Sequence, residues 1–167
     1  LPDIKIDEHI IKACPDIRIG LIRATVKNEP TSEALWNEIE NVSDWVKSNY
    51  ELLEINKRPA VAATRALYRA LGKDPNRYRV ASEALCRRVI RGLGLYRIDT
   101  LVDLINLVSI KSGYAISGLD ADKLQGNTLT LGVGEDGEIY NGIGRGQLNI
   151  CGIPVYRDSI GGVATPT

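Results

Sequence analysis

The spacing of apolar residues changes near residue 113, and this change sets what the chain can fold into. Before it, apolar residues recur every three or four positions, the spacing of one helix face, as in Leu35, Ile39, Val42 and Val46. After it, glycines become frequent and residues 127–133, "NTLTLGV", alternate polar and apolar side chains as strands do. We therefore predict an α+β fold, with an N-terminal strand and helices packed on a mainly antiparallel, glycine-rich β portion.

Start and stop residues predict four helices, which are residues 31–48, 59–71, 81–91 and 99–112. Thr31 or Ser32 is the expected N-cap of the first helix, and Asp99 is that of the last. Gly92 and Gly113 follow the third and fourth helices, where glycine accommodates the left-handed backbone that often ends a helix.

The same spacing predicts which faces of the last two helices are buried. For helix 81–91 the expected inward residues are Ala81, Ala84, Leu85 and Val89. The outer face of that helix is expected to carry Arg79, Glu83, Arg87 and Arg91. For helix 99–112 the expected inward residues are Leu101, Leu104, Ile105 and Val108.

Three further segments have patterns typical of strands and turns. Residues 17–28, "IRIGLIRATVKN", are rich in β-branched residues and are predicted to form a strand. The strand at 128–133 is followed by Asp136-Gly137, a dipeptide that favours a β-hairpin. Residues 142–147, "GIGRGQ", lack the lysine of a phosphate-binding loop, and we expect them to bend a strand or to let a ligand approach the backbone.

The composition fits one globular domain over residues 1–167. The chain is 44% hydrophobic and 25% charged, which supplies enough apolar material for a core. No apolar run approaches the roughly 20 residues that span a bilayer, so we expect a soluble, cytoplasmic protein without a membrane partner. Cys14, Cys86 and Cys151 are odd in number and far apart, which favours reduced thiols and excludes the spacing of a zinc site. No metal and no cofactor are predicted.

Four arginines lie in the segment "LCRRVIRGLGLYRIDTLVD", residues 85–103, of a chain whose formal net charge is zero. Pairing of Arg87 with Glu83 four residues away would explain part of the cluster as a solvated helix face. The dipole at the C-terminus of the helix would account for Arg91 in the same way. Arg88 and Arg97 remain, and guanidinium groups match the geometry of phosphate oxygens. We predict that Arg88, Arg91 and Arg97 contact RNA phosphates.

Other titratable groups give weaker signals. His9 is the only histidine, and we expect it to be a surface residue beside Glu8 rather than part of a catalytic pair. Asp120, Asp122 and Lys123 form a polar cluster for which turn and capping roles are favoured over metal binding or acid–base work.

The stretch from Tyr78 to Leu124 strongly resembles the B-three/B-four domain, the editing module of the phenylalanyl-tRNA synthetase beta chain, and its free-standing relatives. The resemblance returns at "GIPVYRDSIGGVATPT", residues 152–167. It implies an editing-module-like region over residues 76–167, continuing in relatives beyond Thr167, and a helical lead-in over residues 1–75.

In the synthetases this module is an α+β domain that hydrolyses the ester of tyrosine wrongly attached to phenylalanine tRNA. The resemblance implies the same fold, and a related activity, for the present chain. Val102, Asp103 and Asn106 match a Val-Asp-x-Thr-Asn segment of the family pocket, while Ile105 replaces its threonine. Ser117 replaces the family histidine. The downstream matches are Asp120, Asp122, Lys123 and Leu124, and Gly161-Gly162 stands at the Ala-Gly turn.

These correspondences give a predicted site without a histidine. Asn106 and Ser117 are the expected catalytic residues, and Ile105, Gly161 and Gly162 are the expected substrate-binding residues. No counterpart of the family glutamate that reads the tyrosine hydroxyl stands before Thr167, so we do not expect tyrosine specificity.

Two functions of different class follow from the resemblance. One is a stand-alone domain that binds the acceptor end of tRNA and its aminoacyl group, with or without hydrolysis of the ester. The other is a non-catalytic module that binds a small ligand or a protein partner in the former amino-acid pocket.

Overall fold

The computed structural model describes residues 1–143 and 146–167 and divides the chain into two compact units. Unit 1 comprises residues 1–23, 66–78 and 119–166. Unit 2 comprises residues 24–65 and 79–118, together with Thr167. Each unit combines segments that lie far apart in the sequence, so neither coincides with the predicted regions 1–75 and 76–167. That residues 1–167 act as a single domain stays a prediction.

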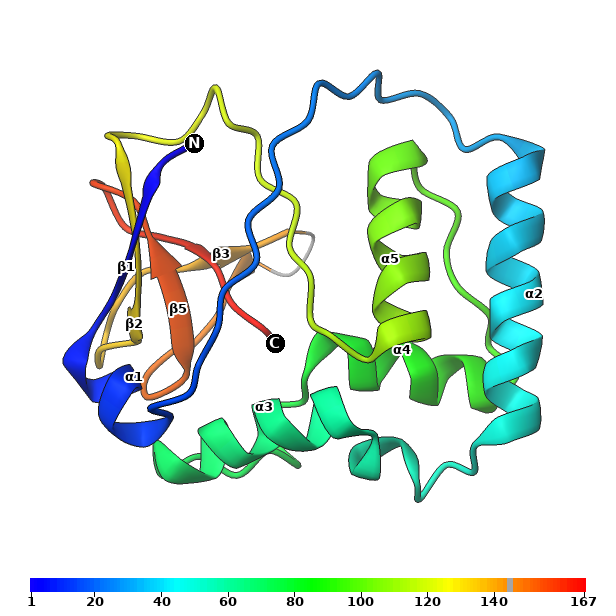
Figure 1. Cartoon of the computed structure of the whole chain (residues 1–167), viewed down its shortest axis with the longest axis horizontal. Coiled ribbons are helices and arrows are strands. Elements are labelled where there is room, and N and C mark those ends of the chain that lie inside the picture. Colours follow the sequence, from blue (N-terminus) through cyan, green and yellow to red (C-terminus); the bar gives the residue numbers. More distant parts are fainter. Residues whose placement is uncertain (144–145) are drawn as a thin grey trace. The chain divides into compact units, whose positions relative to one another are not determined.

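The helices (Figure 1) are α1 (Glu8–Ala13), α2 (Glu33–Asn49), the 3-10 helix η1 (Ile55–Lys57), α3 (Pro59–Ala70), α4 (Ala81–Ile90) and α5 (Thr100–Ser112). The helices α2 to α5 begin and end close to the predicted residues, whereas α1 and η1 were not predicted. The Ser32 side chain accepts from the Leu35 amide, and the Asp99 side chain accepts from the Val102 amide. Gly113 ends α5 with a φ of 85°, a backbone conformation that favours glycine. The predicted caps of α2 and α5 are confirmed.

Unit 1 contains a mixed four-stranded sheet in the order β1-β2-β5-β6. Its strands are β1 (Asp3–Ile6), β2 (Thr128–Val133), β5 (Pro154–Arg157) and β6 (Gly162–Ala164). β1 is parallel to β2, while the β2–β5 and β5–β6 pairs are antiparallel. Two short strands, β3 (Asn141–Gly142) and β4 (Gly146–Gln147), form a separate antiparallel pair. The α+β class, the N-terminal strand and the mainly antiparallel β portion are confirmed.

The strand predicted over residues 17–28 is wrong. These residues have no regular secondary structure, and the Ile22 residue is 91% exposed. The N-terminal strand is β1, which pairs with β2, a strand far along the chain. β-branched residues favour a strand only where a neighbouring strand and a buried face are available.

The hairpin predicted at Asp136-Gly137 is also wrong in its pairing. The turn exists, since the Glu138 amide donates to the Glu135 carbonyl and Gly137 has a φ of 73°. However, β2 pairs antiparallel with β5 rather than with the residues that follow the turn. Within the predicted bend at 142–147, Gly142 pairs with Gly146, and residues 144–145 lie outside the described residues.

The predicted inward faces of α4 and α5 are correct only in part: Val89 is buried and Leu85 packs against the core of unit 2, whereas other predicted residues are exposed. The buried residues of α4 are Ser82, Glu83, Cys86 and Val89, while Ala84 is exposed. The buried residues of α5 are Asp103, Leu107, Ser109 and Ile110. Leu104 and Val108, which were expected inside, are 44% and 42% exposed. Each helix therefore buries a carboxylate that accepts a hydrogen bond from a distant residue, Glu83 in α4 and Asp103 in α5. Some apolar side chains of the same helices are exposed instead.

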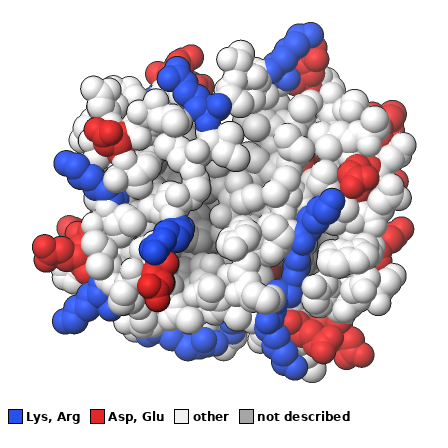
Figure 2. Space-filling model, viewed as in Figure 1, with Lys and Arg blue, Asp and Glu red and all other residues white. Residues whose placement is uncertain are grey.

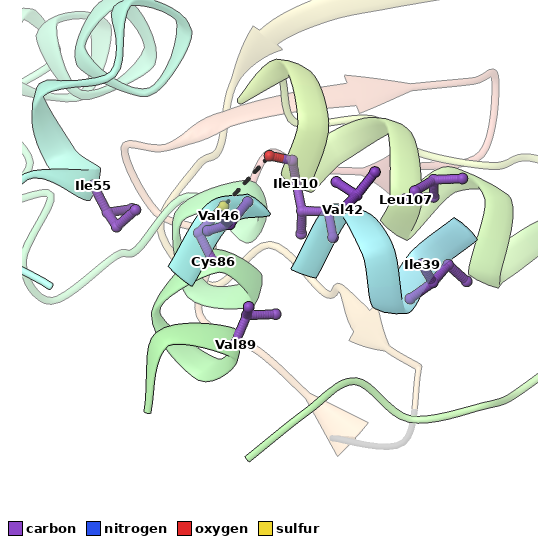
Figure 3. Packing of buried hydrophobic residues seen from close by; sticks show 8 residues of the cluster. All are labelled: Ile39, Val42, Val46, Ile55, Cys86, Val89, Leu107 and Ile110. Atoms are coloured by element: carbon purple, nitrogen blue, oxygen red, sulfur yellow. Dashed lines mark hydrogen bonds between the residues drawn. The ribbon is translucent and has the colours of Figure 1, made fainter. Parts of the chain in front are cut away.

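Each unit has its own group of buried apolar residues. In unit 2, side chains from η1, α2, α4 and α5 pack together around Val46, Cys86 and Ile110 (Figure 3). The Cys86 thiol donates to the Ile110 carbonyl at 3.8 Å, the dashed line in that figure. In unit 1, Ile150, Ile153 and Val155 pack with Tyr78 and Tyr140. Burial raises the pKa of the Cys86 thiol, which keeps this cysteine protonated in the core.

Loss of Glu138 is expected to change the acid stability of unit 1. Arg157 donates to Glu138 through Nε at 2.7 Å and through Nη2 at 2.5 Å, and these bonds hold the pKa of Glu138 below its ordinary value of 4.5. The stabilisation is present above the unfolded-state pKa and is lost as the pH falls through the folded-state pKa. We expect Glu138→Gln to cost about 1.5 to 3 kcal/mol at pH 7.

Urea unfolding of both proteins between pH 7 and pH 2 checks this prediction. The difference between wild type and Glu138→Gln should shrink as the pH falls below 4.5. Glu8→Gln, at an exposed position of the same unit, is the control and should stay within about 0.5 kcal/mol of wild type. A difference independent of pH would show that the ion pair contributes nothing in solution.

Candidate functional site

The predicted site residues on α5 lie next to a rigidly held part of the helix. Asp103 is 1% exposed, and its carboxylate accepts hydrogen bonds from the Thr31 hydroxyl and from the Ile98 amide. These bonds tie the segments before α2 and before α5 to the helix. The Asp103 that matches the family motif thus has a structural role, and it fixes the first turns of α5 from which Ile105 and Asn106 project.

Gly118 lies close to Ile105. A Cβ placed on Gly118 would lie 2.7 Å from Ile105 Cδ1 and 3.8 Å from Leu101 Cδ2. Glycine at 118 therefore allows the backbone to approach this face of α5. Ser117, one residue earlier, is exposed. The residue after Ser117 thus lies against Ile105, and a shared site for Ser117 and Asn106 stays a prediction.

Asn106 lies about 100° further around α5 than Ile105. Its residue is half-buried, and no hydrogen bond of its side-chain amide is found in the part of the chain that the structure describes. An amide without a partner is able to donate to a bound group at little cost in existing bonds. This distinguishes Asn106 from Asp103, whose oxygens are occupied.

Gly161 and Gly162 belong to unit 1, at the turn between β5 and β6. The Gly161 amide donates to Asp158 Oδ1 at 3.1 Å, and the Asp158 amide donates to the Gly161 carbonyl. Backbone amides of Gln125, Ile160 and Gly161 lower the pKa of Asp158, with Gln125 the largest contributor. The Gly161 amide is therefore engaged, and a substrate oxygen would have to compete with a carboxylate for it.

Gly162 is needed for close packing. A Cβ at this position would lie 3.0 Å from Tyr140 Cδ2 and 3.1 Å from Val155 Cγ2, which is tighter than ordinary contact. At Gly161 the same construction meets nothing within 4 Å. A side chain at 161 would meet open space, whereas one at 162 would require Tyr140 and Val155 to shift by a few tenths of an ångström, so the two glycines are not equivalent.

Two of the three predicted RNA-binding arginines have partners within the chain. Arg88 donates to the Gly94 and Leu93 carbonyls, and its guanidinium lies 4.1 Å from the centre of the Tyr96 ring. Arg97 donates to the Thr31 carbonyl and to Glu33, and it lies over the Trp36 ring. Both side chains hold loops in place, and any phosphate would compete with these contacts.

Arg91 is different from Arg88 and Arg97. Its residue is exposed at the C-terminus of α4, and its side chain has no hydrogen bond or ion pair in the described structure. On the face of the molecule drawn in Figure 2, basic and acidic side chains are interspersed, in keeping with a formal net charge of zero. Binding of a polyanion would therefore depend on a local group of arginines.

Sequence reasoning missed a buried charge cluster in unit 2. Glu83 was expected on the outer face of α4 but is 2% exposed, and its carboxylate accepts from Arg65 at 2.9 Å. Arg79 and Arg87 also approach it, at 3.6 and 4.0 Å. The spacing of Ser82, Cys86 and Val89, at i, i+4 and i+7, is the signal that places Glu83 on the buried side.

The remaining titratable groups occupy the places expected of them. The His9 side chain is 83% exposed, and its Nδ1 lies 2.8 Å from the Asp7 carboxylate. Asp120 accepts from the Asp122 amide and lies 3.4 Å from the Lys123 ammonium, as expected of a turn.

Two open pockets lie in unit 2, and neither includes a predicted site residue. One, of about 260 Å³, is lined by Asn41, Val42, Trp45 and Lys111. The other, of about 270 Å³, is lined by Asn49, Tyr50, Glu54, Lys57, Arg58 and Pro59. Arg58 is occupied, because it donates to the carbonyls of Ile110 and Lys111 and to the Cys86 sulfur. The residues that line these pockets include none of the predicted catalytic, substrate-binding or RNA-binding residues.

A family model described as the B3/4 domain matches residues 63–167, well over half of the chain. The chain belongs to the B3/4 domain family. Domains of this kind are found in phenylalanyl-tRNA synthetase beta chains, which points to a role connected with tRNA. Comparisons with curated proteins and with solved structures gave no match. In the described part of the chain, each helix is too short or too polar to cross a membrane.

Proposed function

We propose that the chain binds the acceptor end of tRNA and hydrolyses an aminoacyl ester carried there. The family match over residues 63–167 carries this proposal, because it includes every predicted site residue. B3/4 domains occur in a synthetase subunit that works on aminoacylated tRNA, and the resemblance of residues 78–124 concerns the editing module in particular.

The proposed hydrolysis needs no metal and no cofactor. A water oxygen attacks the ester carbonyl carbon, the bond from that carbon to the ribose oxygen breaks, and a water proton passes to the ribose. The products are the free amino acid and uncharged tRNA. Because an aminoacyl ester is already activated, orientation of the water and stabilisation of the developing oxyanion are sufficient for acceleration.

Asn106 and Ser117 are the proposed groups for this chemistry. The Asn106 amide, which has no hydrogen bond in the described structure, supplies a donor for the oxyanion, and the exposed hydroxyl of Ser117 is able to hold the water. Ile105 supports an apolar wall for the aminoacyl side chain, together with Leu101. Gly161 and Gly162 belong to unit 1, and their part in substrate binding stays a prediction; the Gly161 amide is already donating to Asp158.

A panel of aminoacyl-tRNAs incubated with the whole chain tests the proposal. We expect loss of the ester from at least one member of the panel, measured as release of labelled amino acid. Retention of every ester combined with tRNA binding would reduce the function to binding. Retention of every ester without tRNA binding would overturn the proposal.

One observation favours the second candidate, a non-catalytic binding module. Leu104 and Val108 expose apolar surface on α5, next to the half-buried Leu101 and Ile105. Apolar surface of this kind is typical of ligand or partner binding when it is contiguous. Under this candidate the same face binds its ligand without ester loss, so the panel experiment separates the two functions.

Salt dependence tests the RNA contacts of Arg88, Arg91 and Arg97. Removal of one phosphate-binding side chain should lower the slope of log affinity against log salt by about 0.7 to 0.9. We expect the full effect from Arg91→Ala, whose side chain is exposed, and smaller effects from Arg88→Ala and Arg97→Ala. The control is Lys27→Ala, which removes an exposed cation already paired with Glu29 at 2.6 Å. Equal slopes in all five proteins, wild type included, would remove these arginines from the interface.

A further inference from the structure

The buried cluster around Glu83 has far more positive than negative charge. Arg65, which is buried with an exposed side-chain fraction of 5%, donates to Glu83 Oε2 at 2.9 Å. Arg79 Nε lies 3.6 Å and Arg87 Nη1 lies 4.0 Å from the other oxygen, Oε1. The last two distances are too long for hydrogen bonds. The Glu83 carboxylate therefore lies within 4.0 Å of three guanidinium groups but accepts a hydrogen bond only from that of Arg65 among the described residues.

Two donors in this cluster have no partner. The Nε atoms of Arg79 and Arg87 are buried, and neither has a hydrogen bond within the described residues. A buried donor without a partner costs free energy of about 1 to 3 kcal/mol. Arg87 donates through Nη1 to the Leu52 carbonyl, and this hydrogen bond does not satisfy its Nε. The cluster is thus short of acceptors as well as of negative charge.

The electrostatics of Arg87 agree with this imbalance. Its pKa is lowered first by burial and then by repulsion from Arg79, while Glu83 raises it. Arg91 and Arg65 add to the repulsion. Glu83 and Arg87 lie one turn apart on α4, while Arg79 precedes the helix and approaches the Glu83 carboxylate, and Arg91 follows Ile90 at the C-terminal end.

The cluster is also accessible from solvent. The Arg79 side chain is 39% exposed, and the Arg87 side chain is 16% exposed. Arg88 and Arg97 donate to chain carbonyls, as Arg87 does, and in addition lie over aromatic rings. An oxyanion that reached Arg79 and Arg87 would add the negative charge and the acceptors that Glu83 alone does not provide.

We infer that Arg79 and Arg87, with Arg91 beside them, form a phosphate-binding site on α4. The inference rests on the proposed function in one respect, namely that the phosphate belongs to the backbone of tRNA. It changes the expected interface, because Arg87 was assigned to Glu83 and Arg79 was given no role in RNA binding. Glu83 holds the arginines in position from the buried side.

Salt titrations of tRNA binding with single variants test the inference. Arg79→Gln is expected to lower the salt slope by about 0.7 to 0.9, and Arg79→Lys should keep the wild-type slope because it keeps the charge. Arg18→Gln, at an exposed arginine of unit 1, is the control and should leave the slope unchanged. Arg79 is half-exposed, so its variants are expected to fold, and thermal unfolding of each protein checks this.

Inorganic phosphate is the second probe, because it does not require RNA. We expect Arg79→Gln and Arg87→Gln each to weaken phosphate binding about tenfold, the effect of removing one charge-assisted hydrogen bond. Wild-type binding of tRNA with unchanged slopes in both variants would overturn the site and leave the proposed function intact. Phosphate binding that depends on Arg79, in a wild type that binds no tRNA, would support the site with free phosphate as its ligand and overturn the proposed function. No response of either ligand to Arg79→Gln would overturn the inference.

Discussion

Glu83→Gln is expected to lower the free energy of unfolding of unit 2 by about 3 to 5 kcal/mol. Glu83 is 2% exposed and is paired with the buried Arg65, so the change leaves a buried cation without its counter-charge. Arg79 and Arg87 lose the same carboxylate, which increases the repulsion among the three arginines. Because whole domains are stable by only about 5 to 15 kcal/mol, the loss should be obvious in urea or thermal unfolding.

Two further variants make this expectation specific. Glu38→Gln removes a carboxylate from an exposed position of α2 and should change the free energy of unfolding by less than about 0.5 kcal/mol. Arg65→Met, added to Glu83→Gln, should recover part of the loss because it removes the uncompensated buried charge. Equal stability of Glu83→Gln and Glu38→Gln would mean that Glu83 is solvated.

Helix ends were predictable because their determinants are local. Ser32, Asp99 and Gly113 form hydrogen bonds with backbone groups three or four residues away. Such caps can therefore be predicted from the neighbouring sequence alone. The α+β class follows from periodicity for the same reason. None of these features depends on what the helix packs against.

The face of α2 was predicted correctly from spacing, but the polar part of the buried faces of α4 and α5 was not, because it depends on partners distant in the sequence. Glu83 is buried with Arg65, 18 residues earlier, and Asp103 is buried with Thr31, 72 residues earlier. Without knowledge of its partner a carboxylate is assigned to solvent, as Glu83 was. Leu104 and Val108 were placed inside by apolarity alone, yet Leu107 and Ile110 occupy the core.

Strand pairing failed for a related reason. β2 was expected to pair with the residues after the Asp136-Gly137 turn, but its neighbours are β1 and β5. The pairing of residues 3–6 with 128–131 joins two segments that are far apart in the sequence, and no local pattern predicts it. Residues 17–28 had suitable composition but gained no neighbouring strand.

The candidate site rests on the family resemblance, and its residues stay predictions. The resemblance selected Ile105, Asn106 and Ser117 by their positions in the sequence, and it gave no indication that Gly118 lies against Ile105. It did not reveal that Asp158 engages the Gly161 amide, because that bond is made by a side chain outside the quoted motif. It also gave no indication that carbonyls and aromatic rings occupy Arg88 and Arg97.

Asn106→Ala is expected to lower the rate constant for aminoacyl-tRNA hydrolysis by about a hundredfold or more, the effect typical of removing one oxyanion donor. Under the proposed function, the negative charge that develops on the ester oxygen is stabilised by the Asn106 amide. That amide gives up no hydrogen bond to do so, since none is found for it in the described structure. Asn106→Asp keeps the size of the side chain but replaces the donor by a carboxylate, so it should be at least as inactive.

Three measurements distinguish this chemical role from a structural one. The thermal midpoint of Asn106→Ala should stay close to that of wild type, and its affinity for tRNA should be unchanged, because donors that act in the transition state leave ground-state binding intact. Asn41→Ala, at an exposed position of α2, and His9→Ala should both retain full activity. Full activity of Asn106→Ala would exclude Asn106 as the donor. Loss of activity in His9→Ala with Asn106→Ala unaffected would move the chemistry to unit 1, where Asp7 orients the His9 ring and a general-base mechanism would replace the one proposed.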